Sequence, residues 1–270
     1  MTTELPARIM GILNVTPDSF SDGGHFASTE AALDQADKLI DAGADILDIG
    51  GESTRPFADP VSAEDELQRV IPVIRGIRRN HSIPISIDTT KAAVAREALD
   101  AGADIINDIS ALQKDAEMIS LVKKTTVPVI IMHMQGKPAD MQIAPEYQDV
   151  IKDILDFFRA RIDWITGNGV ALSRLIIDPG IGFGKTLQHN LSILKNLKKF
   201  SLLGTPVLLG HSRKRFLGDI TKTAIEEERD LATAVVSALC YTENIAIIRV
   251  HNVAATRQAL LVTEAIRSAT

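Results

Sequence analysis

The stretch Leu175-Ile-Ile-Asp-Pro-Gly-Ile-Gly-Phe-Gly-Lys185 changes within a few residues from apolar to polar and flexible. Its three leading apolar residues suit a strand of a parallel sheet that is covered on both faces. Asp178 and Pro179 end that pattern, and the three glycines that follow allow a backbone to approach a ligand closely. The stretch therefore predicts a buried strand whose carboxyl end opens into a site. A tight turn before a helix is the simpler explanation of these residues taken alone.

The same change from an apolar run to a polar exit recurs along the chain. The apolar runs predict strands over residues 8–13, 46–49, 83–87, 103–106, 127–132, 175–177, 206–209 and 245–250. The segments after them predict helices over residues 28–42, 62–79, 90–101, 116–124, 147–166, 187–200, 226–242 and 254–268. Ser28 is expected to cap the first helix, and Thr89 or Thr90 the third. The pattern amounts to eight strand–helix units.

Two segments almost repeat each other: Asp41-Ala-Gly-Ala-Asp-Ile-Leu-Asp-Ile-Gly50 and Asp100-Ala-Gly-Ala-Asp-Ile-Ile-Asn-Asp-Ile109. Each spans a helix end, a glycine turn and a strand, which indicates repeated βα units. Eight such units predict an α/β fold, a single closed (β/α)8 TIM barrel with long loops after strands 1 and 2 at its C-terminal mouth. An open doubly wound sheet is the alternative, but residues 14–24 lack the GxGxxG motif expected there. Residues 1–270 are expected to form one barrel domain.

The composition restricts the functional classes. The 270 residues are 45% hydrophobic and 24% charged, with a net charge of -6, which argues against a general nucleic-acid or membrane surface. The single Cys240 excludes an internal disulfide and favours a reducing cytoplasm. No targeting signal is visible, and no stretch approaches the ~20 apolar residues of a membrane span. We expect a cytoplasmic protein with neither nucleic-acid nor membrane partners.

Polar side chains follow every expected strand. In characterised barrels the C-terminal strand ends meet at one mouth, where catalysis takes place. These ends carry Asn14, Glu52, Thr54, Arg55, Asp88, Asn107, Asp108, His133, Asp178, Ser212, Arg213, Lys214, Arg249 and His251. Contact with water could explain one polar strand end, but eight polar strand ends together favour a catalytic or binding site.

One group of these residues suits a flat heterocycle. Asp88, Asn107 and Asp178 provide carboxylates and an amide from the third, fourth and sixth strands. Such acceptors pair with the ring donors of a pterin or a purine. Hydrogen bonding within the barrel mouth is the alternative role for all three.

A second group suits an anion. Arg55, Arg249 and His251, with Thr54 and Asn14, would form a rim that attracts phosphate, although surface salt bridges are the alternative. The sequence contains no HExxH, no Cys/His cluster, no Walker lysine motif and no GxSxG, so zinc hydrolysis, P-loop phosphotransfer and serine-esterase chemistry lack support. Any metal is expected to be Mg²⁺ shared with substrate phosphates, because Mg²⁺ needs only one or two protein oxygens.

Several long motifs resemble those of the bacterial dihydropteroate synthase family. The matching segments cover almost the whole chain and are residues 14–24, 48–56, 131–136, 178–185, 212–214 and 249–251. The departures are Phe57 for a usual glycine, Ala111 and Leu112 for Gly-Gly, Ala116 for proline, Arg215 for serine and Asn252 for aspartate. None replaces a presumed ligand. Phe57 could change the motion of the second loop, and Arg215 the charge beside Lys214.

The resemblance implies a transferase that condenses 6-hydroxymethyl-7,8-dihydropterin pyrophosphate with p-aminobenzoate to give 7,8-dihydropteroate and pyrophosphate in folate biosynthesis. It implies Mg²⁺ as cofactor and sensitivity to sulfonamides. The implied pterin-binding residues are Asp88, Asn107, Met132, Asp178, Phe183 and Lys214. The implied pyrophosphate-binding residues are Asn14, which also binds the metal, Thr54, Arg55, Arg249 and His251. The implied p-aminobenzoate-binding residues are Pro56, Phe183, Ser212 and Lys214. Lys214, Asp88 and Arg249 are expected to be catalytic, and the loops over 15–26 and 52–59 to close over the substrates.

Two other functions use the same ring contacts. A methyltetrahydrofolate-type methyltransferase would share the carboxylates and the amide but would need no pyrophosphate rim. A non-catalytic pterin-binding paralogue would keep the motifs without turnover. The apolar helix over residues 226–242 could pack on its own barrel or on a second subunit, and the family resemblance favours a homodimer.

Overall fold

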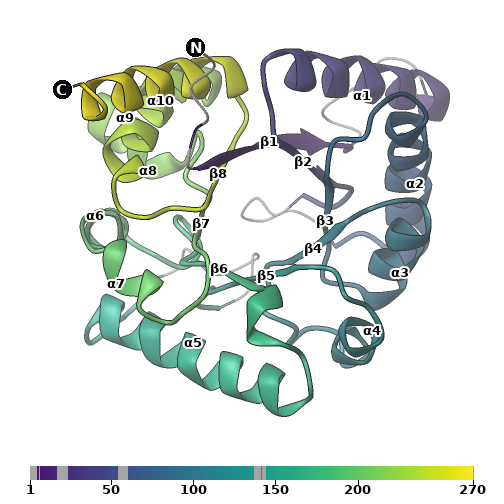
Figure 1. Cartoon of the computed structure of the whole chain (residues 1–270), viewed down its shortest axis with the longest axis horizontal. Coiled ribbons are helices and arrows are strands. Elements are labelled where there is room, and N and C mark those ends of the chain that lie inside the picture. Colours follow the sequence, from purple (N-terminus) through teal and green to yellow (C-terminus); the bar gives the residue numbers. More distant parts are fainter. Residues whose placement is uncertain are drawn as a thin grey trace.

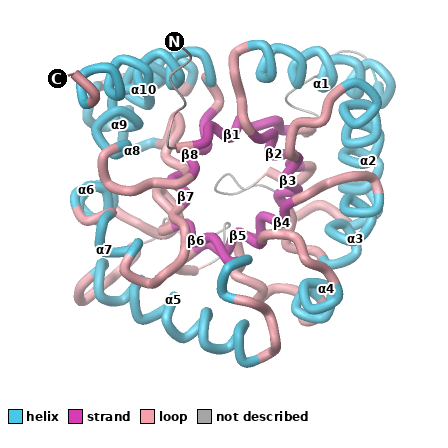
Figure 2. The backbone as a smooth tube through the Cα atoms, in the orientation of Figure 1, coloured by secondary structure: helices cyan, strands magenta, loops and turns pink. Residues whose placement is uncertain are grey.

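Eight parallel strands form one sheet in the computed structural model, which describes residues 5, 7–16, 24–53, 60–136, 141 and 144–269. The strands are β1 (Arg8–Asn14), β2 (Ile46–Gly50), β3 (Ile85–Asp88), β4 (Ile105–Asp108), β5 (Val129–Met132), β6 (Leu175–Asp178), β7 (Leu208–Leu209) and β8 (Ile247–Val250). They lie in the order β6-β5-β4-β3-β2-β1-β8-β7. A parallel bridge between Ile177 and Val207 joins β6 to the start of β7, and the strands form a ring in Figure 2. The predicted (β/α)8 TIM barrel is confirmed.

Helices surround the ring on its outer side (Figure 1). They are α1 (Gly24–Asp41), α2 (Ala63–Asn80), α3 (Ala92–Asp100), α4 (Met118–Lys124), α5 (Val150–Gly167), α6 (Leu187–Lys195), α7 (Lys198–Ser201), α8 (Arg215–Thr221), α9 (Asp230–Tyr241) and α10 (Val253–Arg267), with short 3-10 helices η2 (Leu172–Arg174) and η3 (Glu227–Arg229). Among the described residues, no helix is both long enough and apolar enough to span a membrane.

Several helix boundaries differ from the sequence predictions. The helix expected over residues 187–200 is divided into α6 and α7, and the one expected over 226–242 begins as η3. The short α8 was not predicted. Helix α1 begins at Gly24, so Ser28 lies inside it and is not its cap. Neither Thr89 nor Thr90 caps α3, because Asp115 of a later loop accepts the hydrogen bond of Ala92 N at 2.7 Å.

The near-repeat in the sequence forms a strap between neighbouring strands at the N-terminal end of the barrel. Asp45 N donates to Ile9 O at 2.8 Å, and Ile9 N donates to Asp45 Oδ2 at 2.7 Å. Asp104 forms the same pair with Ile85: Asp104 N donates to Ile85 O at 2.7 Å, and Ile85 N donates to Asp104 Oδ2 at 2.9 Å. Each aspartate therefore satisfies a backbone donor and acceptor of the preceding odd-numbered strand. At this end of a barrel, such residues contribute to stability.

Replacing Asp104 with alanine should lower the free energy of unfolding by ~1–3 kcal/mol, because the buried Ile85 would lose the acceptor of its backbone N–H. Urea titration measures this change. The matched control Asp100→Ala removes an exposed aspartate from the same repeated segment and should be nearly neutral. Equal losses for the two variants would show that the strap does not stabilise the barrel.

The barrel has two separate apolar layers. Outward-facing strand residues such as Ile87 and Ile177 pack on the helices, where Ile74 and Phe158 are fully buried. Inward-facing residues form a smaller cluster inside the ring, made of Met10, Ile46, Ile105, Ile130, Leu208 and Ile247 with Ile176 and Ala246 against it. Because strand side chains alternate between the two faces, the next inward residue of each strand lies two positions further along. This second level is the floor of the mouth.

Candidate active site

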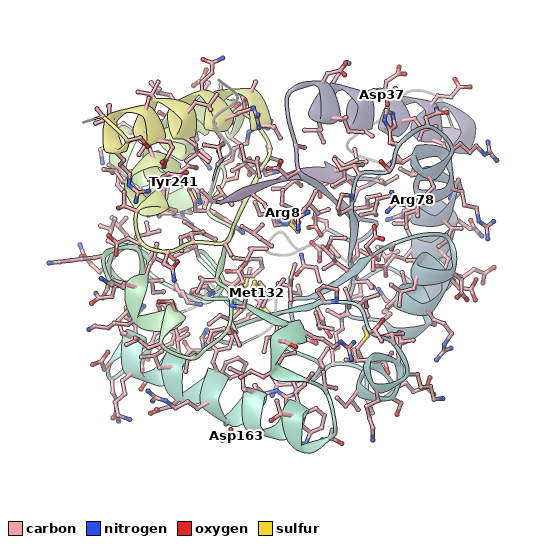
Figure 3. All side chains as sticks on the ribbon, in the orientation of Figure 1. Arg8, Asp37, Arg78, Met132, Asp163 and Tyr241 are labelled. Atoms are coloured by element: carbon pink, nitrogen blue, oxygen red, sulfur yellow. The ribbon has the colours of Figure 1, made fainter. Side chains whose placement is uncertain are left out.

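Polar side chains replace the apolar ones at the second inward level. Moving two residues along the strands from the interior cluster gives the polar Asp48, Asn107, Asp178 and Arg249, together with Ile12, Met132 and Gly210. Strand register brings Asn14, Gly50, Asp88 and Asn107 to one height in adjacent strands. Figure 3 labels Met132 on the β5 side of the ring. Closure of the sheet thus assembles residues that are far apart in the sequence.

A partly buried ion pair lies at this level. Arg249 Nε contacts Asp48 Oδ2 at 2.6 Å, and its Nη2 contacts Asp88 Oδ2 at 2.8 Å. Asn107 Nδ2 lies 3.2 Å from Asp48 Oδ2, which directs the amide oxygen of Asn107 elsewhere. Sequence reasoning placed Arg249 on an anion rim, separate from the carboxylates. The structure joins them, so Arg249 also supports the predicted pterin residues.

Asp48 was absent from the predicted site, and it has no exposed surface. The alternation of side chains on β2 could have identified it, because it lies two residues after the inward-facing Ile46. Burial and the nearby Asp48 carboxylate raise the pKa of Asp88 to about 7, and Arg249 opposes that rise. Asp88 is therefore easily protonated, which makes it a hydrogen-bond donor as well as an acceptor.

Asp178 is buried at the end of β6 with its oxygens in two different environments. Its Oδ1 accepts a hydrogen bond from Gly180 N at 2.8 Å. A Cβ atom added to Gly210 would come within 3.2 Å of Oδ2, so the glycine keeps space beside that oxygen. Burial raises the pKa of Asp178, whereas the Gly180 N–H and the Lys214 charge lower it.

Lys214 and Phe183 form one wall of the site. The Lys214 ammonium lies 4.0 Å from the centre of the Phe183 ring, a cation–π contact. Phe183 and Met132 also share a small apolar cluster with Ile109 and Met141. Burial, followed by the Arg249 charge, lowers the pKa of Lys214 to about 8. The wall carries one cation, which interacts electrostatically with Asp88 on β3 and Asp178 on β6.

The exits of β7 and β8 meet at a second cationic location. Ser212 Oγ lies 2.9 Å from His251 Nδ1 and accepts a hydrogen bond from His251 N at 3.1 Å. Burial and the charges of Arg213, Arg249 and Lys214 lower the pKa of His251 to about 3. His251 is therefore neutral at physiological pH in a positive field, which suits an anion.

The first two loops are only partly described. Asn14 ends β1 with an exposed side chain, and a Cβ atom on Gly50 would lie 3.9 Å from its Oδ1. Thr54, Arg55 and Pro56 lie outside the described residues. No cluster of three or more His, Cys, Asp or Glu side chains that could hold a metal occurs in the described part of the chain. The single amide oxygen of Asn14 still fits a Mg²⁺ ion that takes its remaining ligands from phosphate and water.

Three other polar strand exits have structural roles. Asp108 accepts hydrogen bonds from Ser110 N at 2.7 Å and Leu112 N at 3.2 Å. Glu52 binds Lys91 Nζ at 2.8 Å and accepts from Val61 N at 3.0 Å. His133 contacts the buried Lys185, as described below. The sequence predicted polar exits for all three but could not show which way they point.

Comparison with known proteins was consistent over almost the whole chain. Residues 10–251 match the family described as "Pterin binding enzyme". The dihydropteroate synthase of Synechocystis sp. is 45% identical over 258 residues, which cover 96% of this chain and 89% of that protein. The chain belongs to the dihydropteroate synthase family of pterin binding enzymes.

Solved structures of this family superpose closely on the chain. The Yersinia pestis dihydropteroate synthase, determined with a sulfonamide drug, has a TM-score of 0.92 and 42% identity, with 98% of this chain and 95% of that chain covered. The Xanthomonas albilineans enzyme with 4-aminobenzoic acid has a TM-score of 0.92 and 44% identity, covering 98% and 94%. Another structure of the same enzyme contains 7,8-dihydropteroate. The chain is therefore a transferase of the dihydropteroate synthase type.

Lys185 is a buried lysine that sequence reasoning did not assign, although it ends the Gly-rich motif of this family. Its Nζ lies 3.0 Å from His133 Nδ1, 2.9 Å from Phe183 O and 3.3 Å from His133 O. These contacts fasten the β6 exit to the β5 exit. Burial lowers the pKa of Lys185 to about 7.

Replacing Lys185 with methionine should destabilise the fold by ~1–3 kcal/mol, because buried carbonyl groups lose a donor. The loss should grow as the pH rises from about 7 to about 10. In that range the unfolded chain holds the Lys185 proton more tightly than the folded chain, so rising pH stabilises the wild type and not the variant. Denaturant titrations across the range measure the difference.

The matched control Lys195→Met removes an exposed lysine from α6 and reports the effect of losing a surface amine. If the loss of unfolding free energy in Lys185→Met stays constant from pH 7 to pH 10, Lys185 remains fully charged in the folded protein.

Proposed function

We propose that the chain condenses 6-hydroxymethyl-7,8-dihydropterin pyrophosphate with p-aminobenzoate at the barrel mouth. The observation that carries this proposal is the set of acceptors on β3, β4 and β6, of which Asn107 and Asp178 are buried, together with the wall of Lys214 and Phe183. A flat ring with several N–H donors fits between such acceptors and such a wall. Family membership supports the same reaction.

The pterin would bind to Asp88, Asn107 and Asp178 through its ring donors, with Met132 and Phe183 as apolar walls. Gly210 places no side chain beside Asp178 Oδ2, so this oxygen would accept from the ring. Asn107 donates to Asp48, so its amide oxygen would accept from the ring. A raised pKa allows Asp88 to share a proton with the ligand. The acceptors thus belong to strands and not to loops, which fixes their positions.

The pyrophosphate would lie near His251, Arg249 and Asn14. His251 is neutral and surrounded by cations, and Arg249 retains one guanidinium nitrogen beyond the two that bind carboxylates. Thr54 and Arg55 are expected to contribute from the second loop. Asn14 would hold Mg²⁺ on the pyrophosphate, where the metal would stabilise the negative charge of the leaving group.

The p-aminobenzoate would lie against Phe183, Ser212 and Lys214, with Pro56 expected to complete its site. In the reaction, the amine nitrogen forms a bond to the exocyclic methylene carbon of the pterin, the C–O bond to pyrophosphate breaks, and the amine loses one proton. Lys214 would complement charge at the point where the bond forms. No nucleophilic side chain is required, so the protein acts by positioning and electrostatics.

Pyrophosphate release by the purified chain tests the function. We expect release only when the pterin ester, p-aminobenzoate and Mg²⁺ are all present, with dihydropteroate formed in equal amount. Release without p-aminobenzoate would indicate a hydrolase. Binding of the pterin without release would favour the non-catalytic paralogue, and methyl transfer from a folate would favour the methyltransferase. The cationic location at His251 favours the synthase over that last alternative.

Asp178→Asn should weaken pterin binding roughly ten- to a hundredfold, since each mismatched buried donor costs ~1–3 kcal/mol. Calorimetry with 6-hydroxymethyl pterin measures the affinity, and thermal melts follow folding. The matched control Asp108→Asn changes a buried aspartate whose hydrogen bonds go to Ser110 and Leu112. That control should lose stability and keep its affinity. Unchanged affinity in a folded Asp178→Asn variant would contradict the pterin assignment.

The chain is also proposed to act as a cytoplasmic homodimer that sulfonamides inhibit. An exposed apolar stripe on α9, defined here as Leu231, Val235 and Leu239, continues onto Val262 and Ile266 of α10. The three α9 residues are spaced by four, so they lie on one helix face. The two helices are side by side, with Tyr241 Oη 3.1 Å from Glu264 Oε2 (Figure 1). A second copy would cover this stripe and remove it from water.

Leu239→Glu should convert the dimer to a monomer, because a charge at the centre of a buried apolar interface is costly. Sedimentation equilibrium measures the mass. The control Leu172→Glu places the same charge on an exposed residue of η2 and should leave the dimer intact. A wild-type monomer at all concentrations would rule out the dimer.

A further inference from the structure

The backbone of Arg213 is in a left-handed conformation, with φ of 57°. Residues other than glycine adopt this conformation rarely, because their Cβ atom approaches the following carbonyl oxygen. Arg213 lies between Ser212 and Lys214, two residues proposed to contact substrate. Strained backbone persists only where surrounding contacts fix it, and it clusters at functional sites. The contacts that fix Arg213 therefore determine how Lys214 leaves β7.

The guanidinium, the backbone N–H and the carbonyl oxygen of Arg213 all form hydrogen bonds with residues 229–233. These residues lie at the end of η3 and in the first turn of α9. Its guanidinium binds Asp230 with both ends, Nε to Oδ1 at 2.6 Å and Nη2 to Oδ2 at 2.9 Å. Its backbone N donates to Thr233 Oγ1 at 3.1 Å. Its carbonyl oxygen accepts from Arg229 Nη1 at 3.0 Å. The bidentate pair with Asp230 is the strongest of these contacts and the most restrictive in geometry.

The β8 exit is fastened to the same carboxylate. Asn252 Nδ2 donates to Asp230 Oδ2 at 2.9 Å, while its Oδ1 accepts from Ala255 N at 3.0 Å and caps α10. The neighbouring His251 is bound to Ser212. One carboxylate thus links the loops that carry Lys214 and His251. Asn252 stands where the family often has aspartate, and an aspartate here would place two negative groups against each other. Asn252 and Asp230 are therefore complementary, because the neutral amide donates to the carboxylate.

We propose that Asp230 is a positioning residue, which holds Arg213 in its left-handed conformation and so directs Lys214 onto the Phe183 ring. The Lys214 side chain, which contacts the Phe183 ring, is also closely packed against Gly182. A Cβ atom on Gly182 would lie 3.0 Å from Lys214 Cδ. A small change in the direction of the chain at residue 213 would move Lys214 out of this space. The inference rests on the proposed role of Lys214 in the condensation.

The first test compares two replacements of Arg213. Arg213→Ala loses the bond to Asp230 and keeps the strain, whereas Arg213→Gly loses both, since glycine adopts positive φ freely. Arg213→Ala and Asp230→Asn should each lower kcat/KM for p-aminobenzoate roughly tenfold, and Arg213→Gly should recover most of that loss. Asp230→Asn should have little further effect in the Arg213→Gly protein. Equal losses for the alanine and glycine variants would overturn the proposal.

A second readout separates positioning from simple support of the fold. If Lys214 leaves its partly buried place, its pKa should rise from about 8, so the alkaline limb of the kcat/KM profile should move to higher pH in Asp230→Asn. Loss of fold stability alone would lower the melting temperature and leave that limb unchanged. Asn252→Asp should shift the limb in the same direction. An unmoved limb in both variants would also overturn the proposal.

The matched control is Asp219→Asn on α8, which removes an exposed carboxylate 3.9 Å from Arg215 and should leave both readouts unchanged. The wild-type protein serves as the reference for the function itself. If it releases no pyrophosphate with both substrates, the proposed reaction fails. If the wild type is active and Arg213→Ala and Arg213→Gly have the same kcat/KM, only the role of Asp230 fails. Should Asp230→Asn not fold, the two Arg213 variants still decide the question.

Discussion

The ion pair of Arg249 with Asp48 and Asp88 is the interaction on which the mouth of the barrel depends. Asp48 has no exposed surface, and an unpaired buried carboxylate costs several kcal/mol or becomes protonated. Arg249 comes from β8 and reaches across β1 to β2 and β3. Asn107 of β4 then orients on the neutralised Asp48. Four strands thus contribute to one ion-paired and hydrogen-bonded unit.

This unit would allow one site to bind both a neutral ring and an anionic group, as the proposed function requires. Three carboxylates, on Asp48, Asp88 and Asp178, lie within the reach of two cations, on Arg249 and Lys214. The carboxylates lie deep on the strands, whereas Ser212 and His251 lie on the exits of β7 and β8, where positive charge dominates. A ligand with ring donors at one end and phosphates at the other therefore meets complementary charge along its whole length.

The sequence predicted the barrel well because each strand is an apolar run that ends in a polar residue or a glycine turn. It predicted the strand-borne Asp88, Asn107 and Asp178 for the same reason. Asp48 was missed because the alternation of side chains on β2 indicates only that it points inward, and nothing local indicates its partner Arg249, which lies 201 residues away. Helix α8 was missed because seven residues are too few to show a period. The separation of α6 from α7 was missed because apolar residues continue through the break. Side-chain direction at His133 and Glu52 depends on tertiary contacts, which no local pattern encodes.

The two ends of the barrel use the same chemistry for different purposes. At the N-terminal end, Asp45 and Asp104 accept backbone N–H groups of neighbouring strands, and their hydrogen bonds remain within the fold. At the C-terminal end, Asp178 gives one oxygen to Gly180 N and holds the other beside Gly210, where the missing side chain leaves room. A buried carboxylate with an oxygen reserved for a ligand lowers the stability of the fold, so interactions elsewhere must offset this cost. The straps at the opposite end are one source of that stability, since they act on strands whose other ends form the site.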